Sequence, residues 1–182
     1  MSTLILDLGS HSAKAYLSRE TVKQIGVTTW SLLENHLEEK QVEFHLQKLL
    51  STINLPLNNK IAFGTEAMRR NPKYSEIMSS VCSRLEIQYK TITQQEESAL
   101  IYQALSHEKI DHVVNAGGGS IQIVSKQGET TLLPFGISDL NQQFDLNSEP
   151  KLRKISDCID FVSHQLPNEI GLFSYTGGER QY

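Results

Sequence analysis

Two short apolar segments of this sequence each run into a glycine-containing turn and continue at once as a second strand-like segment. The first is "TLILDLGSHSAKAYLS" (3–18), and the second is "VVNAGGGSIQIV" (113–124). An apolar run, a tight turn and an alternating run predict a β-hairpin. Because this order of elements begins again about 110 residues later, we predict two similar halves. If the halves face each other, both glycine turns lie in one cleft.

The remaining segments alternate between strand and helix patterns. Further strands are predicted over 21–30, 60–63 and 87–92, and in the second half after the turn "KQGE" and before the glycine pair "GG" (177–178). Helical spacing of apolar residues, with cap and proline signals, predicts helices over 36–53, 65–71, 73–85, 93–106, 138–144 and 150–166. The boundary between the halves is expected near residues 107–112.

Composition narrows the class of protein. Charged residues make up 21% of the chain and apolar residues 38%, which predicts a folded core. The net charge of −4 offers no electrostatic footprint for nucleic acid or an anionic membrane. Asp7 and Gly9 interrupt the first apolar run, so no signal peptide is predicted, and no segment reaches the roughly 18 apolar residues that span a bilayer. We therefore predict a soluble cytoplasmic α/β protein in which Cys82 and Cys158 are reduced and buried.

The first turn, "DLGSHS" (7–12), has groups that suit both an anion and a cation. Gly9 permits a tight turn, and Ser10 to Ser12 can direct backbone amides and hydroxyls at an anion. Asp7 ends the strand and is placed to hold Mg²⁺ through water. An ordinary hairpin turn, with Asp7 as its hydrogen-bonded corner, is the alternative interpretation.

The second turn contains three consecutive glycines, Gly117 to Gly119, followed by Ser120. Their spacing fits neither the Rossmann nor the Walker motif. Glycine does allow backbone N–H groups to approach a phosphate closely, and a flexible hairpin turn is the alternative. A carboxylate is expected beside a phosphate turn that does chemistry, but the candidate positions carry amides, Asn115 and Gln122.

Two further segments contain charged side chains. In "TQQEESALIY" (93–102), Thr93 is a good N-cap and Glu96 occupies the capping-box position. The cap is the preferred interpretation from these residues alone, and a water-orienting carboxylate is the functional one. In "GTEAMRR" (64–70), Arg69 and Arg70 are adjacent on a short helix, so one can contact phosphate while the other is solvated. Plain solvated charge is the alternative there.

Taken together and in order, these segments resemble the exopolyphosphatase/guanosine pentaphosphate phosphatase family, within the actin/sugar-kinase/Hsp70 superfold. The resemblance covers two phosphate motifs, a Gly-Thr-x-x-x-Arg segment, an acidic helix start, the segment after the second motif and a later glycine loop. The matching stretches are "ILDLGSHSAKAYL", "AFGTEAMRRNPKYSEIM", "ITQQEESALIYQAL", "VVNAGGGSIQIV", "TLLPFGISDLNQQF" and "SYTGG".

The resemblance implies two ribonuclease-H-like domains, over 1–109 and 110–182, with mixed sheets flanked by helices. It also implies a Mg²⁺-dependent phosphohydrolase that removes terminal phosphates from polyphosphate or guanosine pentaphosphate. By position, Asp7 would bind the metal and Glu96 would activate the attacking water. The implied phosphate-binding residues are Gly9, Ser10, Arg69, Gly117, Gly118, Gly119 and Ser120.

Three positions depart from the family's pattern. His11 stands where the family has asparagine, Asn115 where it has aspartate, and Gln122 where it has glutamate. A neutral amide offers Mg²⁺ one carbonyl oxygen and no charge, so weaker metal binding is expected. The second domain also stops soon after its glycine pair, which we interpret as either a truncated chain or a naturally short protein.

These observations predict a hydrolase of phosphoanhydride bonds, with polyphosphate or guanosine pentaphosphate as its partner and a homodimer as a further expectation. No nucleic-acid or membrane partner is predicted. Because two acids are replaced, an inactive phosphate- or nucleotide-binding sensor of the same fold is the alternative. A small-molecule kinase of the same superfold is a third interpretation, but it leaves "GTEAMRR" and "QQEES" unexplained.

Overall fold

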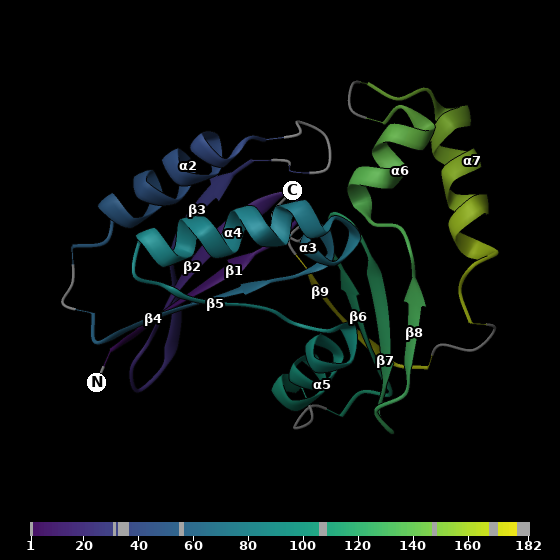
Figure 1. Ribbon diagram of the computed structural model, residues 1–182. Coiled ribbons are helices and arrows are strands. Elements are labelled where there is room, and N and C mark those ends of the chain that lie inside the picture. The colour runs from purple at the N-terminus through teal and green to yellow at the C-terminus, as the bar shows by residue number, and fades with distance from the viewer. Residues whose placement is uncertain are drawn as a thin grey trace. The chain divides into compact units, whose positions relative to one another are not determined.

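The computed structural model describes residues 2–30, 32, 37–54, 57–105, 109–146, 149–167 and 171–177. The chain divides into two compact units, Met1–Gln94 and Gln95–Tyr182, and each contains a mixed β-sheet with helices (Figure 1). The predicted α/β fold with two sheet-containing halves is therefore confirmed. The domain boundary at 109/110 remains a prediction, whereas the compact units divide at the start of helix α5 (Gln94–Leu105).

Among the described residues, the sheet of the first unit has the strand order β3-β2-β1-β4-β5. Its strands are β1 (Thr3–Leu8), β2 (Ser12–Ser18), β3 (Val22–Thr29), β4 (Asn59–Gly64) and β5 (Gln88–Thr91). The first three strands pair antiparallel, and β4 and β5 extend the sheet parallel to β1. The predicted hairpin over 3–18 and the third strand over 21–30 are confirmed.

The helices of the first unit are α2 (Glu39–Ser51), α3 (Glu66–Arg70) and α4 (Pro72–Arg84). Helices α2 and α4 pack against each other and lie on the same face of the sheet (Figure 1). Side chains alternate along a strand, so Leu4, Leu6 and Leu8 of β1 all point into the core, where they are fully buried. The helices contribute Val42, Leu46, Leu49, Ile77, Met78 and Val81 to this core.

Pro72 begins α4 rather than lying between two helices. The Asn71 side chain accepts a hydrogen bond from the backbone N–H of Lys73 at 3.1 Å and caps α4. Proline suits the first helical position because its fixed φ is helical and no backbone N–H is needed there. The helix predicted from residue 73 therefore starts one residue earlier, and only Asn71 separates it from α3.

Among its described residues, the second unit has the strand order β8-β7-β6-β9. Its strands are β6 (His112–Ala116), β7 (Ile121–Ser125), β8 (Thr130–Leu133) and β9 (Phe173–Gly177), and its helices are α5, α6 (Ile137–Phe144) and α7 (Leu152–Ser163). Helix α7 begins two residues after Pro150, the predicted start, with Lys151 as its N-cap. None of the helices in the described ranges combines the length and apolarity needed to traverse a bilayer.

The predicted duplication is confirmed by topology. In each unit a hairpin is followed by an antiparallel third strand, and a later strand pairs parallel to the first strand of the hairpin. The register matches as well, because Asp7 pairs with Lys14 in the first hairpin and Asn115 pairs with Gln122 in the second. Corresponding residues are 108 positions apart.

Both cysteines are buried and unpaired, as expected. Burial raises the pKa of the Cys82 thiol to about 11, so this side chain is an inert part of the core.

Candidate functional site

The turn between β1 and β2 is fixed by bonds to its backbone oxygens. The N–H of Gly9 donates to the carbonyl of Ser12 at 2.9 Å and closes the turn. The indole of Trp30 donates from Nε1 to the carbonyl of Gly9 at 2.9 Å. The backbone N–H of Trp30 donates to the carbonyl of His11 at 3.0 Å. Trp30 is itself buried, so it holds the turn from the core side.

These bonds determine which way the amides of the first turn point. A third carbonyl, that of Ser10, accepts from the N–H of Leu32 at 2.8 Å. In a trans peptide the C=O and the following N–H point in opposite directions. Because the carbonyls are drawn toward Trp30 and Leu32, the N–H groups of Ser10, His11 and Ser12 are directed to the other side. Successive amides that point one way form an anion-binding surface.

The second turn repeats this construction with a different support. The N–H of Gly117 donates to the carbonyl of Ser120 at 2.9 Å, the same closure as in the first turn. Its supporting donors come from the amino end of α6. The N–H of Ile137 donates to Gly117 O at 3.0 Å, and the N–H of Ser138 donates to Gly118 O at 2.9 Å. These two helix amides are therefore occupied by the turn itself.

By the same peptide geometry, the N–H groups of Gly118 and Gly119 are directed away from α6. The close approach of the helix depends on Gly136, the residue before α6. A Cβ at Gly136 would lie 2.4–2.5 Å from backbone atoms of Gly117 and Gly118. A side chain there would push the turn off the helix, so Gly136 belongs to the candidate site, although no sequence signal selected it.

The cross-strand pairs beside the two turns differ in charge. Asp7 lies directly opposite Lys14, and Asn115 lies directly opposite Gln122. Directly opposite residues share one face of a sheet. The first turn is thus flanked by a carboxylate and an ammonium group, and the second by two amides. The pKa of Tyr16 is raised by burial and also by the negative charge of Asp7. Lys14 was missed because it reads as an ordinary polar residue of an alternating strand.

The carboxylate that the second turn lacks locally comes from α5. Gln122 is fully buried, and its Nε2 donates to Oε2 of Glu97 at 3.1 Å. Oε1 of Gln122 has no hydrogen-bond partner within the described part of the chain. Gln122 is two residues beyond Ser120, the last residue of the glycine turn. Glu97 therefore brings a negative charge to the strand pair that carries this turn.

Glu96, the carboxylate selected from the sequence, precedes Glu97 in the first turn of α5 and is half-buried. Adjacent helix residues point about 100° apart, so only the packing of α5 shows which one meets the sheet. The contact with Gln122 belongs to Glu97, which was not predicted from the sequence. The sequence shows that two glutamates are adjacent, but it does not show which of them faces the sheet. The catalytic role of Glu96 stays a prediction.

Arg69 and Arg70 share one carboxylate. Oε2 of Glu66 accepts from Nε and Nη2 of Arg69 at 3.1 and 2.9 Å, and Oε1 accepts from Nε of Arg70 at 3.0 Å. Nη1 of Arg69 donates to the carbonyl of Ile92 at 3.0 Å. Arg69 is therefore held in a single orientation, and Arg70 is ion-paired rather than simply solvated. Phosphate binding by Arg69 stays a prediction.

Helix α3 joins Arg69 to the end of β1. The N–H and hydroxyl of Thr65 both donate to the carbonyl of Leu8, at 3.3 and 3.4 Å. The parallel register places Gly64 opposite Leu8. Asp7 and the first turn thus lie at the carboxyl ends of β1 and β4, where α3 begins.

The match to a family model decides the identity of the chain. The model of the Ppx/GppA phosphatase family matches residues 45–181. The chain belongs to the Ppx/GppA phosphatase family. The resemblance inferred from the two turns and the segments between them is confirmed.

Solved structures share the fold of this Ppx/GppA protein. A Ppx/GppA phosphatase of Aquifex aeolicus matches with a TM-score of 0.66 and 22% identity, over 98% of this chain and 68% of that chain. An exopolyphosphatase of Cytophaga hutchinsonii matches with a TM-score of 0.66 and 14% identity, over 91% of this chain and 61% of that one. The ethanolamine utilization protein EutJ of Carboxydothermus hydrogenoformans matches with a TM-score of 0.56 and 16% identity, over 91% of this chain and 64% of that chain. Curated proteins gave no match. The chain thus spans about two thirds of the length of these structures.

The donor set of this Ppx/GppA chain limits how a metal can bind. Within the described ranges, no group of three or more His, Cys, Asp or Glu side chains could hold an ion. The residues beside the second turn, Asn115 and Gln122, offer only neutral amides. Mg²⁺ typically binds through one or two carboxylates together with waters and substrate phosphates. Asp7 with phosphate oxygens fits that mode, whereas a site made of protein ligands alone does not fit.

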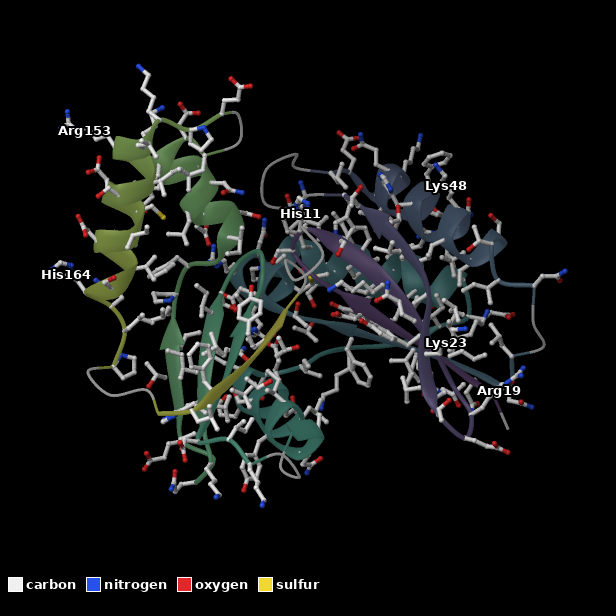
Figure 2. The ribbon with its side chains drawn as sticks, turned by 180° about the vertical axis from the view of Figure 1, so that it is seen from behind. His11, Arg19, Lys23, Lys48, Arg153 and His164 are labelled. Carbon is white, nitrogen blue, oxygen red and sulfur yellow. The ribbon has the colours of Figure 1, made fainter. Side chains whose placement is uncertain are left out.

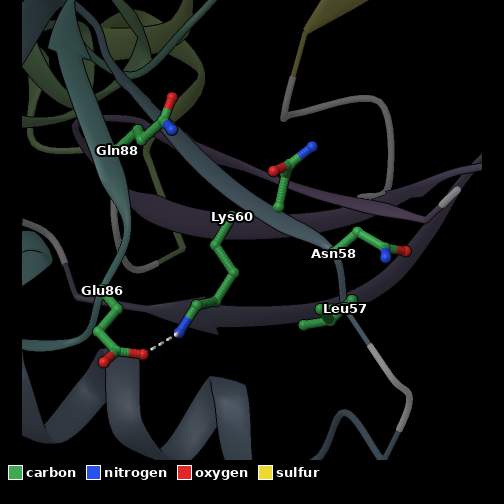
Figure 3. Close-up of a pocket in the computed structure, with 6 residues that line it drawn as sticks. Leu57, Asn58, Lys60, Glu86 and Gln88 are labelled. Carbon is green, nitrogen blue, oxygen red and sulfur yellow. Dashed lines mark ion pairs between the residues drawn. The ribbon is translucent and has the colours of Figure 1, made fainter.

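A hollow of about 380 Å³ in the first unit lies away from these residues (Figure 3). It is lined by Leu57, Asn58, Asn59, Lys60, Glu86 and Gln88. These residues belong to the amino ends of β4 and β5, whereas Asp7 and Gly64 are at the carboxyl ends of their strands. The hollow contains one lysine among these lining residues, Lys60. Its Nζ lies 4.0 Å from Oε2 of Glu86 and donates a hydrogen bond to the carbonyl of Leu85 at 2.6 Å. We therefore do not assign this hollow to phosphate.

Proposed function

We propose that this chain is a phosphohydrolase that releases terminal phosphate from polyphosphate or guanosine pentaphosphate. The observation that carries the proposal is the contact between Glu97 and Gln122 beside the glycine turn 117–120. It places a carboxylate next to a turn whose amides suit a phosphate. Family membership supplies the reaction class, because the family consists of phosphatases.

In this proposal the two turns bind phosphate oxygens through backbone N–H groups. Gly9 and Ser10 act in the first turn, and Gly117 to Ser120 act in the second. Hydrogen bonds to a charged phosphate are about twice as strong as those between neutral groups. The supports behind the turns, Trp30 and α6, keep the amides oriented before substrate arrives. Such preorganisation is a large part of catalysis of phosphoryl transfer.

Arg69 is proposed to bind the phosphate chain from the first unit. Its ion pair with Glu66 fixes the guanidinium plane, and a fixed plane loses less side-chain entropy when it binds an oxyanion. Asp7 would hold Mg²⁺ that arrives with the phosphates. The metal would offset negative charge on the phosphate oxygens.

We propose Glu97, rather than Glu96, as the group that orients and deprotonates the attacking water. The amide of Gln122 holds one oxygen of the Glu97 carboxylate in place beside the strand pair that carries the second turn, and a carboxylate held in this way is a well-positioned base. The amino end of α5 also favours negative charge in its first turn. A positioned general base typically contributes about 10²–10⁴-fold to the rate.

The test compares Glu97→Gln with Glu96→Gln, a matched pair that removes one charge from neighbouring positions. Mg²⁺-dependent phosphate release is measured from polyphosphate and from guanosine pentaphosphate. We expect Glu97→Gln to lower kcat by about 10²-fold or more, and Glu96→Gln to have the smaller effect. The reverse order would transfer the role to Glu96. Equal rates in both variants and the wild type would contradict a carboxylate mechanism from α5.

The amide pair Asn115 and Gln122 favours a second function, a sensor that binds phosphate compounds without turnover. Two amides in place of acids reduce repulsion of a polyanion and weaken metal binding. Calorimetric titration with polyphosphate and guanosine pentaphosphate separates the two functions. If the wild-type chain binds these compounds but releases phosphate no faster than the Glu97→Gln variant, the result favours the sensor.

A further inference from the structure

Three hydroxyl groups meet between strand β5 and helix α4. The Tyr89 hydroxyl lies 2.7 Å from Oγ1 of Thr91, and Oγ of Ser75 in α4 lies 2.8 Å from the same Thr91 atom. Oγ of Ser75 is also 3.5 Å from the Tyr89 hydroxyl. A hydroxyl donates one hydrogen bond and accepts others, so these groups can satisfy one another. Ser75, Tyr89 and Thr91 thus form a hydroxyl cluster.

The hydroxyl cluster lies at the end of the sheet that carries the first turn. Thr91 pairs with Gly64, and Gly64 pairs with Leu8 at the end of β1. Figure 2 shows His11 of the first turn at the opposite end of this sheet from Lys23. The cluster is therefore built into the end of the sheet that carries the candidate site, and not into the amino ends of β4 and β5.

Gly64 fits the Tyr89 hydroxyl closely. A Cβ at position 64 would lie 2.5 Å from the Tyr89 hydroxyl oxygen, 3.2 Å from Cε2 of its ring and 3.0 Å from Cγ of Met68. The hydroxyl therefore occupies the space that a side chain at position 64 would need. Burial raises the pKa of Tyr89 above its ordinary value, so the hydroxyl keeps its proton at neutral pH.

Two backbone groups of Ile92 connect the hydroxyl cluster to Arg69. The N–H of Ile92 donates to the carbonyl of Gly64 at 3.0 Å, and the carbonyl of Ile92 accepts from Nη1 of Arg69 at 3.0 Å. Ile92 follows Thr91 directly in the chain. A shift at the end of β5 would therefore move the oxygen that holds one side of the Arg69 guanidinium.

Strand β5 depends on such an anchor because it is short and lies at an edge. It has four residues, and it is the last strand in the order of its sheet among the described residues. The backbone of an edge strand is paired along one side only. The bond from Ser75 to Thr91 ties the end of this strand to α4, and the Tyr89 hydroxyl braces the same Thr91 oxygen.

We propose that Tyr89 is a positioning residue for phosphate binding, which acts on the Arg69 guanidinium through Thr91 and the Ile92 carbonyl. The inference rests on the proposed role of Arg69 as a ligand of the phosphate chain. Tyr89 itself does not contact phosphate in this arrangement. Its hydroxyl holds the end of β5, so the guanidinium is in place before an oxyanion binds and loses less side-chain entropy.

Titration calorimetry of the full chain with polyphosphate tests the inference through the dissociation constant. Tyr89→Phe keeps the ring and removes the hydroxyl, and we expect it to raise the dissociation constant by about 2- to 10-fold. Thr28→Val is the matched control, because it also removes a hydroxyl that joins a strand to a helix, 3.1 Å from Nδ1 of His45. This control should bind like the wild type. Circular dichroism confirms that the variants are folded.

Two substitutions of Thr91 show whether the hydroxyl is the group that acts. Thr91→Val removes the hydroxyl and keeps the branched shape, whereas Thr91→Ser keeps the hydroxyl and loses only a methyl group. We expect Thr91→Val to weaken polyphosphate binding as Tyr89→Phe does, and Thr91→Ser to bind like the wild type. If Thr91→Ser weakened binding as much as Thr91→Val, the inference would be overturned.

A double-mutant cycle shows whether Tyr89 acts through Arg69. Arg69→Met should raise the dissociation constant for polyphosphate by about 10- to 100-fold, since bonds to a charged group are lost. In that background Tyr89→Phe should have no further effect, because the group that it positions is gone. A further loss as large as in the wild-type background would overturn the inference.

The same measurements separate this inference from the proposed function. If Arg69→Met weakens binding and Tyr89→Phe does not, the inference alone is wrong. If Arg69→Met binds polyphosphate as well as the wild type, or the wild type does not bind it, the proposed role of Arg69 is wrong and the inference is wrong with it. If binding follows these expectations in a chain that releases no phosphate, the inference is supported and only the hydrolase is contradicted.

Discussion

The amide of Gln122 donates a hydrogen bond to the carboxylate of Glu97 at 3.1 Å, across 25 residues of sequence. An amide cannot ionise, so position 122 adds no charge beside this carboxylate. An amide donor at position 122 suits a neighbouring carboxylate. Glu97 therefore brings negative charge to the strand pair that carries the second turn, although the pair itself, Asn115 and Gln122, is neutral.

Gln122→Glu should destabilise the protein at pH 7 by about 3 kcal/mol or more, because two carboxylates would then meet in a buried position. One of the pair acquires a raised pKa, so the folded state binds a proton more tightly than the unfolded state. The free energy of unfolding of this variant therefore increases as the pH falls from 7 toward 5. Urea unfolding at several pH values measures this.

Gln122→Met is the control for that variant. It removes the amide donor but adds no charge, so its cost should be about 1–3 kcal/mol and should not decrease toward pH 5. Equal pH profiles for the two variants would mean that the residue at 122 does not interact with Glu97 in solution.

Gly136→Ala should disturb the second glycine turn, residues 117–120, more than Gly117→Ala does. Its Cβ would collide with backbone atoms of Gly117 and Gly118, which cannot rotate away. We expect a cost of about 1–3 kcal/mol and, if the turn binds phosphate as proposed, at least a tenfold loss of phosphate affinity. Gly117→Ala is the comparison, because its Cβ would meet Ser120 O at 3.4 Å. A Gly136→Ala variant no worse than Gly117→Ala would show that the turn is not held by α6.

Trp30→Phe should loosen the first turn while keeping an aromatic ring in the core. The variant loses the indole bond to the carbonyl of the half-buried Gly9, and the loss of one hydrogen bond costs about 0.5–1.5 kcal/mol. If the turn binds phosphate, affinity should fall as well. Titration calorimetry with polyphosphate, beside thermal unfolding, separates the two effects. Unchanged affinity in a measurably destabilised variant would argue against phosphate binding at the first turn.

Arg84 joins α2 to α4, and its contribution to stability should depend on pH. Hydrogen bonds lower the pKa of Glu39, from Ser80 first and then Arg84, and the Arg84 guanidinium lowers the pKa of Glu43. The stabilisation is present above the ordinary carboxyl pKa of 4.5 and is lost as the pH falls through the lowered values.

Arg84→Met should therefore reduce the melting temperature near pH 7 and have little effect near pH 3. The effect at neutral pH should be small and should shrink in high salt, because these side chains are partly exposed. Arg153→Met is the control, since Arg153 makes only a long contact with Asp157. A temperature difference that persists unchanged at pH 3 would assign the effect to packing of the arginine stem.

Local signals in the sequence predicted most of the elements correctly. The two hairpins were recognisable because a strand period of two switches at a glycine turn, and this pattern depends only on neighbouring residues. The beginning of α4 was misplaced by one residue because proline can end one helix and begin the next. Family membership followed from the order of the segments, which is also a property of the sequence alone.

The sequence by itself determined the two turns and the order of strands and helices, and it predicts which residues meet an anion. Only the tertiary structure decided which side chains stand beside those turns. Glu97 meets Gln122, Trp30 supports Gly9 and α6 supports Gly117 because helices and distant segments pack on the sheet from positions far along the chain. Local periodicity gives the face of a helix but not its partner. That partner depends on how burial and hydrogen bonding are satisfied over the whole unit.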